Sequence, residues 1–276
     1  MRKILVFTSL LILTLLNLNA QTRLLRKDEI DYMNSIYPVI YNAIPHEYKD
    51  WKAVGDKKEF DAIKFYCPVV YAENDCTGRC SVSLGKGDPY TIAYDIQFSM
   101  PEAQSSALMA TAFKSITDFN NATQIASALK GNSKAKLSIR VIVNVSSGKI
   151  GSFLLSYCGK TKPTDLALPV PATLAVLGVH TDGCPFMNDG RPDMAPGDNY
   201  YDNAIVFLGK PVSSQEADDR HDGQVRTRYA IGFDHTKIGI PFTQNIVVLI
   251  KGDAADINAI VSQIDWKALN GLIEKK

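Results

Sequence analysis

Residues 90–98 carry the clearest β-strand pattern in this chain. Large apolar side chains occupy every second position, at Tyr90, Ile92, Tyr94, Ile96 and Phe98. The positions between them are small or polar, which is typical of an antiparallel strand buried on one side. Residues 136–146 alternate in the same way, and a Ser-Ser-Gly turn leads to a further apolar run at 150–157. We expect the last two segments to pair as a hairpin.

Three- and four-residue spacing of apolar side chains predicts one helix in the first half, and a capping pattern predicts another. Residues 28–44 have this periodicity, and Pro38 lies inside the segment, where it would kink or split the helix. Ser99 and Glu102 match a capping box, in which the two residues satisfy free backbone donors at a helix start. They predict a second helix that runs to about residue 116.

The second half offers further strands and a helical C-terminus. The strands are expected at 172–179, 203–208, 224–233 and 245–251. Asp253 is suited to cap a following helix, whose apolar stripe consists of Ile257, Ile260, Val261 and Ile264. Asp265 and Trp266 begin a last helical turn. A polar stretch at 213–223 is expected to be a long hairpin loop before a strand that contains Arg226 and Arg228.

Alternating strands and clustered helices predict an α+β fold, mainly an antiparallel sheet with clustered helices packed on one face. Residues 159–171 contain three prolines and form a candidate internal seam. Leu166, Leu168 and Val170 in this segment favour a packed crossover over a free linker. We therefore expect residues 21–276 to form a single α+β domain.

The first twenty residues have the pattern of a secretory signal peptide. Arg2 and Lys3 precede an apolar run over residues 4–16, and the small residue Ala20 precedes Gln21. The run is shorter than the roughly 20 residues that a membrane-spanning helix needs. We expect cleavage after Ala20 and a secreted or periplasmic mature chain.

Composition and charge narrow the function classes. The chain has 30 basic and 29 acidic residues and is 46% hydrophobic, which is ordinary for a globular protein. A balance so close to neutral gives no electrostatic reason to expect nucleic acid as a partner. No segment after residue 20 has the apolar length of a transmembrane helix.

Five cysteines follow the signal, in a compartment where disulfides form. Cys76 and Cys80 are close in sequence, and Gly78 between them would let a short loop close, so they are the candidate disulfide. The alternative is that these thiols are small buried side chains. A domain of this size does not need a disulfide for its stability.

The segment 180–203 is the candidate metal site. It is dense in Asp, Asn, Gly and Pro, and its candidate ligands are His180, Asp182, Asp189, Asp193 and Asp198. Calcium prefers six to eight oxygen ligands from flexible loops of this kind, although the spacing is not that of an EF-hand. The alternative is ordinary turn chemistry, since the same residue types dominate turns.

A zinc site is the less favoured metal alternative. Zinc takes His, Cys and Asp ligands, and its candidate set is His180, Asp182, Cys184, His221, Asp222, Asp234 and His235. These residues would converge only if the ends of two strands were neighbours.

Motifs of several enzyme classes are missing from the sequence. It contains no nucleophile elbow, no phosphate-binding loop and no dinucleotide fingerprint. The leading hypothesis is an exported non-catalytic domain that binds a ligand or a protein partner in the cell envelope or outside the cell. The alternatives are a metal-assisted hydrolase that uses the 180–203 loop, with His221 or His235, and a domain whose calcium loop is purely structural.

Overall fold

The computed structural model describes residues 22–23, 26–60, 84–85, 90–118, 124–125, 128, 134–145, 153–158, 163–179, 202–209, 212–217, 224–231 and 241–273. The architecture below concerns these residues.

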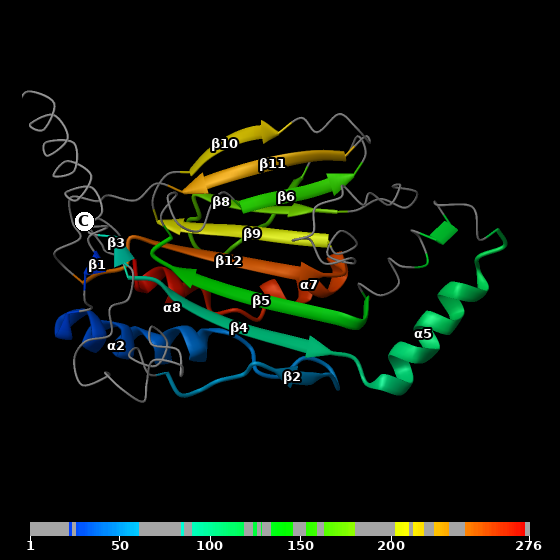
Figure 1. Cartoon of the computed structure of the whole chain (residues 1–276), viewed down its shortest axis with the longest axis horizontal. Coiled ribbons are helices and arrows are strands. Elements are labelled where there is room, and N and C mark those ends of the chain that lie inside the picture. The colour runs from blue at the N-terminus through cyan, green and yellow to red at the C-terminus, as the bar shows by residue number, and fades with distance from the viewer. Residues whose placement is uncertain are drawn as a thin grey trace, which may run out of the picture.

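A seven-stranded antiparallel sheet forms the centre of the molecule (Figure 1). From one edge to the other its strands are β2 (Lys52–Val54), β4 (Ile92–Ser99), β5 (Lys136–Val143), β12 (Asn245–Gly252), β9 (Asp202–Gly209), β8 (Leu174–Gly178) and β7 (Thr164–Asp165). The strands that the alternating pattern predicts at 90–98, 136–146, 172–179, 203–208 and 245–251 are therefore present. Together with the helices, they make the fold a mixed α+β structure.

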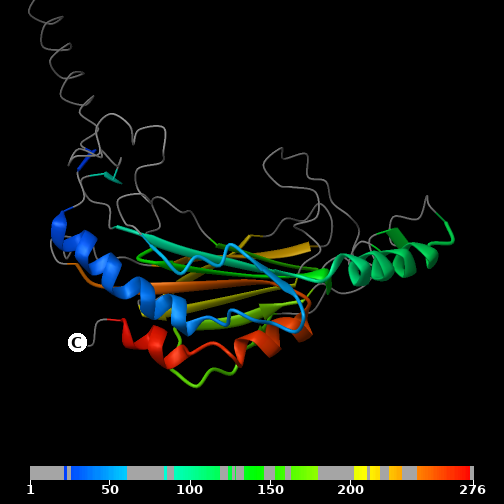
Figure 2. The same cartoon turned by 90° about the horizontal axis from the view of Figure 1, so that it is seen from below.

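One face of this sheet, the first face, carries the main core. Its side chains join those of the helices α2 (Lys27–Ala43), α7 (Ala254–Val261) and α8 (Trp266–Gly271) in one buried cluster. Figure 2 shows these three helices beneath the sheet. Trp266 on α8 is 1% exposed, and its indole N–H donates to the carbonyl oxygen of Val261 over 2.7 Å. The polar atom of this large buried side chain is thus satisfied.

The predicted helix signals near the C-terminus are confirmed. The carboxylate of Asp253 accepts a hydrogen bond from the backbone N–H of Ala255 at the start of α7. Asp265 does the same for Ala268 in α8. The helix predicted at 28–44 is also present as α2, and it continues through Pro38, so Pro38 does not split it.

The helix predicted after Ser99 is α5 (Glu102–Lys114), but its predicted capping box is wrong. The N-cap residue is Pro101, and no side chain caps this end. Ser99 is instead the last residue of β4, opposite Lys136. Strand pairing holds Ser99 in the sheet, so it cannot serve as the helix cap. None of the side chains of α5 is buried, and the helix extends away from the sheet in both views (Figures 1 and 2).

A smaller sheet consists of β10 (Val212–Ala217), β11 (Gln224–Ile231) and β6 (Phe153–Cys158), in this order. The predicted hairpin between 136–146 and 150–157 is wrong, because β6 pairs with β11. Both edges of β5 are occupied, one by β4 and the other by β12. The local turn signal did not reveal that β5 is a central strand.

The expected loop at 213–223 is partly a strand. Residues 212–217 form β10 and pair with β11. Backbone pairing is independent of side-chain polarity, so a polar stretch at the edge of a sheet is compatible with a strand. A further pair of two-residue strands, β1 (Thr22–Arg23) and β3 (Leu84–Gly85), lies near the start of α2.

The segment that contains the candidate seam packs against the core. Leu166, Leu168 and Val170 are partly buried against the main cluster. The seven-stranded sheet takes strands from both sides of residues 159–171.

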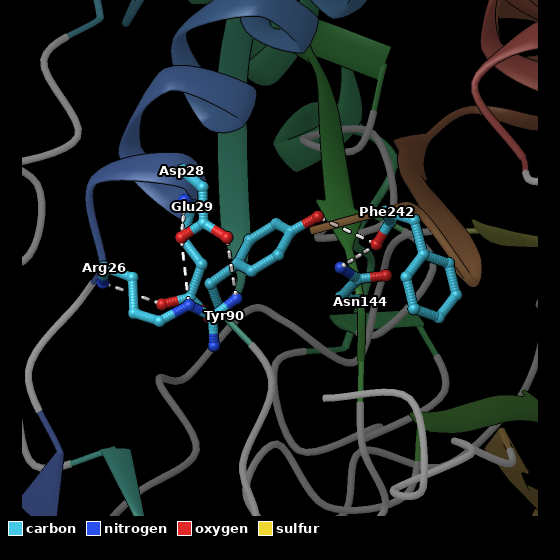
Figure 3. A network of polar contacts seen from close by, with 6 residues as sticks. All are labelled: Arg26, Asp28, Glu29, Tyr90, Asn144 and Phe242. Atoms are coloured by element: carbon cyan, nitrogen blue, oxygen red, sulfur yellow. Dashed lines mark hydrogen bonds and ion pairs between the residues drawn. The ribbon is translucent and has the colours of Figure 1, made fainter. Parts of the chain in front are cut away.

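Polar side chains fasten the end of the sheet next to α2 (Figure 3). The carbonyl oxygen of Phe242 accepts from the Tyr90 hydroxyl over 2.8 Å and from the Asn144 amide over 2.9 Å. At the start of α2, the Arg26 side chain donates to Asp28, and its backbone N–H donates to Glu29 over 2.9 Å. The polar side chains at this end of the sheet are thus engaged in hydrogen bonds within the fold.

Candidate functional site

The second face of the seven-stranded sheet, opposite the face that carries the main core cluster, is divided into an apolar and a polar part. Its apolar row follows the strand register and consists of Ala93, Ile142, Val247, Phe207 and Leu174. Ile142, Val247 and Phe207 are buried in a second, smaller core cluster. Strand β6 of the small sheet contacts β8 and β9. The apolar part of the second face is therefore used for packing.

The polar part lies toward the opposite end of the same strands. One row across the sheet consists of Val54, Gln97, Ser138, Lys251 and Asn203. The next row consists of Lys52, Ser99 and Lys136. Arg140 lies on the same face, two residues along β5 from Ser138. We call the four cations Lys52, Lys136, Arg140 and Lys251 the basic corner.

Strand geometry explains how the basic corner arises. Successive side chains of a strand point to opposite faces. In β5, Leu137, Ile139 and Val141 enter the main core, so Lys136, Ser138 and Arg140 must face the other way. The same alternation in β12 places Val248 and Ile250 in the core and Lys251 on the second face.

The spacing of the cations suits an extended ligand. Lys52 and Lys136 are separated by one strand, which corresponds to roughly 10 Å. Arg140 and Lys251 are diagonal neighbours on adjacent strands, a relation of about 7–8 Å. Each cation therefore has a neighbour of the same charge within reach of one multivalent anion.

One carboxylate lies among these cations. Asp95 on β4 is opposite Arg140, and the Arg140 Nε atom is 3.3 Å from its Oδ1 atom. Both side chains are more than half exposed, at 60% and 54%. Desolvation raises the pKa of Asp95 above its usual range, and the positive charge of Arg140 acts in the opposite direction. On the strands β2, β4, β5 and β12, Asp95 is the sole acid of the second face.

Lys52 and Lys136 are exposed ammonium groups. Among the described residues, neither has a carboxylate within ion-pair distance. A long, solvated lysine with no such partner is available to an incoming anion at little cost, because no existing ion pair must be broken.

A second polar cluster joins α2 to the segment after it. His46 Nδ1 lies 2.9 Å from Asp56 Oδ1, and His46 Nε2 lies 2.9 Å from the carbonyl oxygen of Tyr41. The Tyr94 hydroxyl donates to the same Asp56 oxygen over 3.1 Å. Burial, followed by the nearby Asp56 charge, raises the pKa of Tyr94, so this hydroxyl stays protonated and remains a donor.

The geometry of this cluster leaves no ring nitrogen for chemistry. Both nitrogens of His46 face acceptors, and its ring stacks on Tyr41 with centroids 3.9 Å apart. A general base or a metal ligand needs a nitrogen lone pair that is not already engaged. His46 and Asp56 therefore form a structural clamp between α2 and β4.

All candidate site residues predicted from the sequence lie outside the described residues. This holds for His180, Asp182, Asp189, Asp193 and Asp198, for the other zinc candidates, and for Cys76 and Cys80. The metal and disulfide predictions thus stay predictions. In the described ranges, no group of three or more His, Cys, Asp or Glu side chains is arranged to hold a metal ion.

The ends of the predicted metal loop are described, and they meet at the polar part of the second face. The loop leaves β8 after Gly178 and enters β9 at Asp202. Gly178 pairs with Asn203, which is in the same row as Lys251. The chain therefore enters and leaves the loop beside the basic corner.

The basic corner was missed from the sequence, although part of its signal was visible. Lys136, Ser138 and Arg140 alternate with the apolar residues that predict the strand. That alternation places them on one solvent-facing side. It does not reveal that Lys52 and Lys251, which are about 200 residues apart, lie in neighbouring rows of the same face.

Comparisons with known proteins give no further guidance. The chain matches no protein-family model, no curated protein and no solved structure. Of the described helices, none is long and apolar enough to cross a membrane.

Proposed function

We propose that this protein is an exported non-catalytic domain that binds a ligand or partner in the cell envelope or outside the cell. The signal-peptide pattern of residues 1–20 supports export, and the mature chain from Gln21 onward would be secreted or periplasmic. The observation that carries the binding role is the basic corner, where four cations and one acid share a solvent-facing part of a paired sheet.

The arrangement of layers favours this use of the second face. We propose that α2, α7 and α8 form one clustered helical layer on the first face, where their side chains share its core cluster. The side chains of the first face are then buried in the core, where they stabilise the fold. The polar end of the second face retains charged side chains on β5 and β12, whose backbones are held by neighbouring strands on both sides, and on the edge strand β2, which gives a binding surface built on a paired sheet.

The chemistry of the described polar clusters favours binding over catalysis. His46 has both ring nitrogens engaged, and Asp95 and Arg140 are largely exposed to water. Catalytic electrostatics depend on a water-excluded site, where charges interact strongly. An exposed ion pair beside two lysines is better suited to reversible recognition.

A turnover screen tests the non-catalytic part of the proposal. Purified mature protein, residues 21–276, would be incubated with ester, peptide, glycoside and phosphoester substrates, with and without calcium or zinc. We expect no hydrolysis above the rate of a heat-inactivated sample. Robust hydrolysis of any class, abolished by the double substitution Asp189→Ala and Asp193→Ala, would instead support the metal-assisted hydrolase.

Cell fractionation tests the export part. We expect the full-length chain, expressed with a C-terminal tag, to be recovered outside the cytoplasm with Gln21 as its first residue. A double substitution of Leu11 and Leu13 by Arg, within the apolar run of the signal, should retain the protein in the cytoplasm. Equal export of both forms would contradict the proposal.

A further inference from the structure

We propose that the basic corner binds an acidic polysaccharide, a glycan chain that carries carboxylate or sulfate groups. This inference rests on the proposed binding function and names the chemical class of its ligand. Lys52, Lys136, Arg140 and Lys251 are brought together from β2, β5 and β12 by the register of the sheet.

Charge complementarity carries the choice of an anion. The whole chain is nearly neutral, with a formal charge of +1, yet the second face of the described strands β2, β4, β5 and β12 carries four cations and one acid, Asp95. The register places these cations diagonally or one strand apart, so that none is directly opposite another. An anionic ligand that contacts several of them at once gains electrostatic attraction from each.

The neutral neighbours of the cations favour a glycan. Gln97, Ser138 and Ser99 lie between the charged residues on the same face, and Gln97 donates to the Ser99 hydroxyl over 3.1 Å. Amide and hydroxyl groups of this kind can donate to and accept from sugar hydroxyls. The surface thus combines point charges for acidic groups with hydrogen-bonding groups for the sugar ring.

Two other polyanionic partners fit the surface less well. Proteins that bind single-stranded nucleic acids stack bases on aromatic side chains, and a membrane surface is usually bound with inserted apolar residues. In the described part of the chain, Val54 and Phe113 are the exposed large hydrophobic residues, and of these only Val54 is on the second face. The basic corner has no exposed aromatic residue among its described neighbours.

Affinity measurements with defined polymers test the proposal. The mature protein would be titrated with dextran sulfate, polygalacturonate, neutral dextran and duplex DNA at low salt. We expect saturable binding to dextran sulfate, polygalacturonate or both, and the two arms distinguish sulfate from carboxylate recognition. Binding should weaken as salt is added, because exposed charges are screened.

Charge-removing variants locate the site. The double substitution Lys136→Gln and Arg140→Gln should weaken polysaccharide binding about fivefold to tenfold, as expected for the loss of two exposed ionic contacts. The matched control is Lys114→Gln with Lys267→Gln, which removes the same charge from exposed positions on α5 and α8. The control should bind like the unmodified protein, and both variants should melt within a few degrees of it.

Three results would overturn the inference. They are the absence of binding to both acidic polymers, equal loss of binding in the two double variants, and equally tight binding of DNA at the same face. If a neutral glycan or a protein binds instead, the proposed function survives and only the ligand class is wrong. If polygalacturonate is bound and then hydrolysed, the ligand class survives and the non-catalytic function is wrong.

Discussion

Asp95 is the one acid on the second face of the described strands β2, β4, β5 and β12. It faces Arg140 across the β4–β5 pair, and desolvation raises its pKa. A raised pKa means that the neutral form is reached at a higher pH than for an ordinary aspartate. Arg140 remains charged throughout this range, so protonation of Asp95 makes the basic corner more positive.

Asp95→Asn should therefore strengthen anion binding. We expect a few-fold lower Kd for dextran sulfate at neutral pH, because the repulsive charge is removed. In the unmodified protein, affinity should rise as the pH falls through the raised pKa of Asp95 and decline as the pH rises through it. Dextran sulfate is the suitable probe because its sulfates do not titrate in this range.

The pH profile of the variant provides the control. In Asp95→Asn this part of the pH dependence should be absent. Identical pH profiles for the variant and the unmodified protein would show that Asp95 does not modulate the surface.

The His46 clamp predicts a second effect at the scale of single residues. His46→Ala removes contacts to Asp56 and to the Tyr41 carbonyl, and should lower the free energy of unfolding by about 1–2 kcal/mol, a value reduced for partial exposure. Urea denaturation measures the loss. Lys58→Ala, an exposed position of the same segment, should change stability by less than about 0.5 kcal/mol.

A double-mutant cycle with Asp56→Ala isolates the His46–Asp56 interaction. We expect the two substitutions to be non-additive, since the residues are in direct contact. Additive effects would indicate that the observed contact contributes nothing to stability.

At the scale of elements, the sequence patterns predicted the type and position of helices and strands better than they predicted which strands pair. Alternation located β4, β5, β8, β9 and β12, and three- or four-residue spacing located α2 and α7. The prediction of α5 came from a capping box that the structure does not have. These patterns did not predict the pairing of β6 with β11. A turn signal lies between the apolar segments of β5 and β6, and it favoured a hairpin of these two strands instead. Both edges of β5 are occupied by strands distant in sequence, which a local turn signal cannot predict.

The junction of β5 and β12 depends on a buried asparagine. Asn245 is fully buried, and its side chain accepts from the Val145 N–H over 2.8 Å and donates to the Val145 carbonyl over 2.9 Å. Asn245→Ala should therefore lower the free energy of unfolding by about 2–4 kcal/mol, because two buried backbone groups lose their partner. Chemical denaturation checks this value.

Asn258→Ala is the matched control for this prediction. Asn258 is exposed on α7, and its amide donates to a carbonyl of the same helix. It should cost less than about 0.5 kcal/mol. Equal losses at Asn245 and Asn258 would contradict the role assigned to the buried amide.

At the scale of the whole molecule, the strand ends that flank the 180–203 loop, at Gly178 and Asp202, lie beside the basic corner at one end of the sheet. The calcium alternative predicts that the metal stabilises the mature protein. A cation at about a hundred times its Kd adds about 2.7 kcal/mol, which corresponds to a rise in Tm of roughly 5–10 °C for a chain of this size.

Melting curves of residues 21–276 after chelation, and after addition of calcium or zinc, test this alternative. A rise that is lost in the double variant Asp189→Ala and Asp193→Ala would assign the metal to the loop. No rise with either metal would leave turn chemistry as the explanation of its composition.

The sequence by itself determined the local features of this protein. Periodicity follows from the geometry of one strand or one helix, so the sequence predicted the α+β character and the main strands. It also predicted the cap at Asp253 and the start of a last helical turn at Asp265. The apolar run and its basic start are likewise local, and they carry the prediction of export.

Only the tertiary structure decided which surfaces these elements form. Lys52 and Lys251 share one face because antiparallel pairing places β2, β4, β5 and β12 side by side. Such pairing depends on the relative stability of many long-range contacts, whose combinations no local pattern specifies. The basic corner is a product of that pairing, and therefore became visible only in the folded chain.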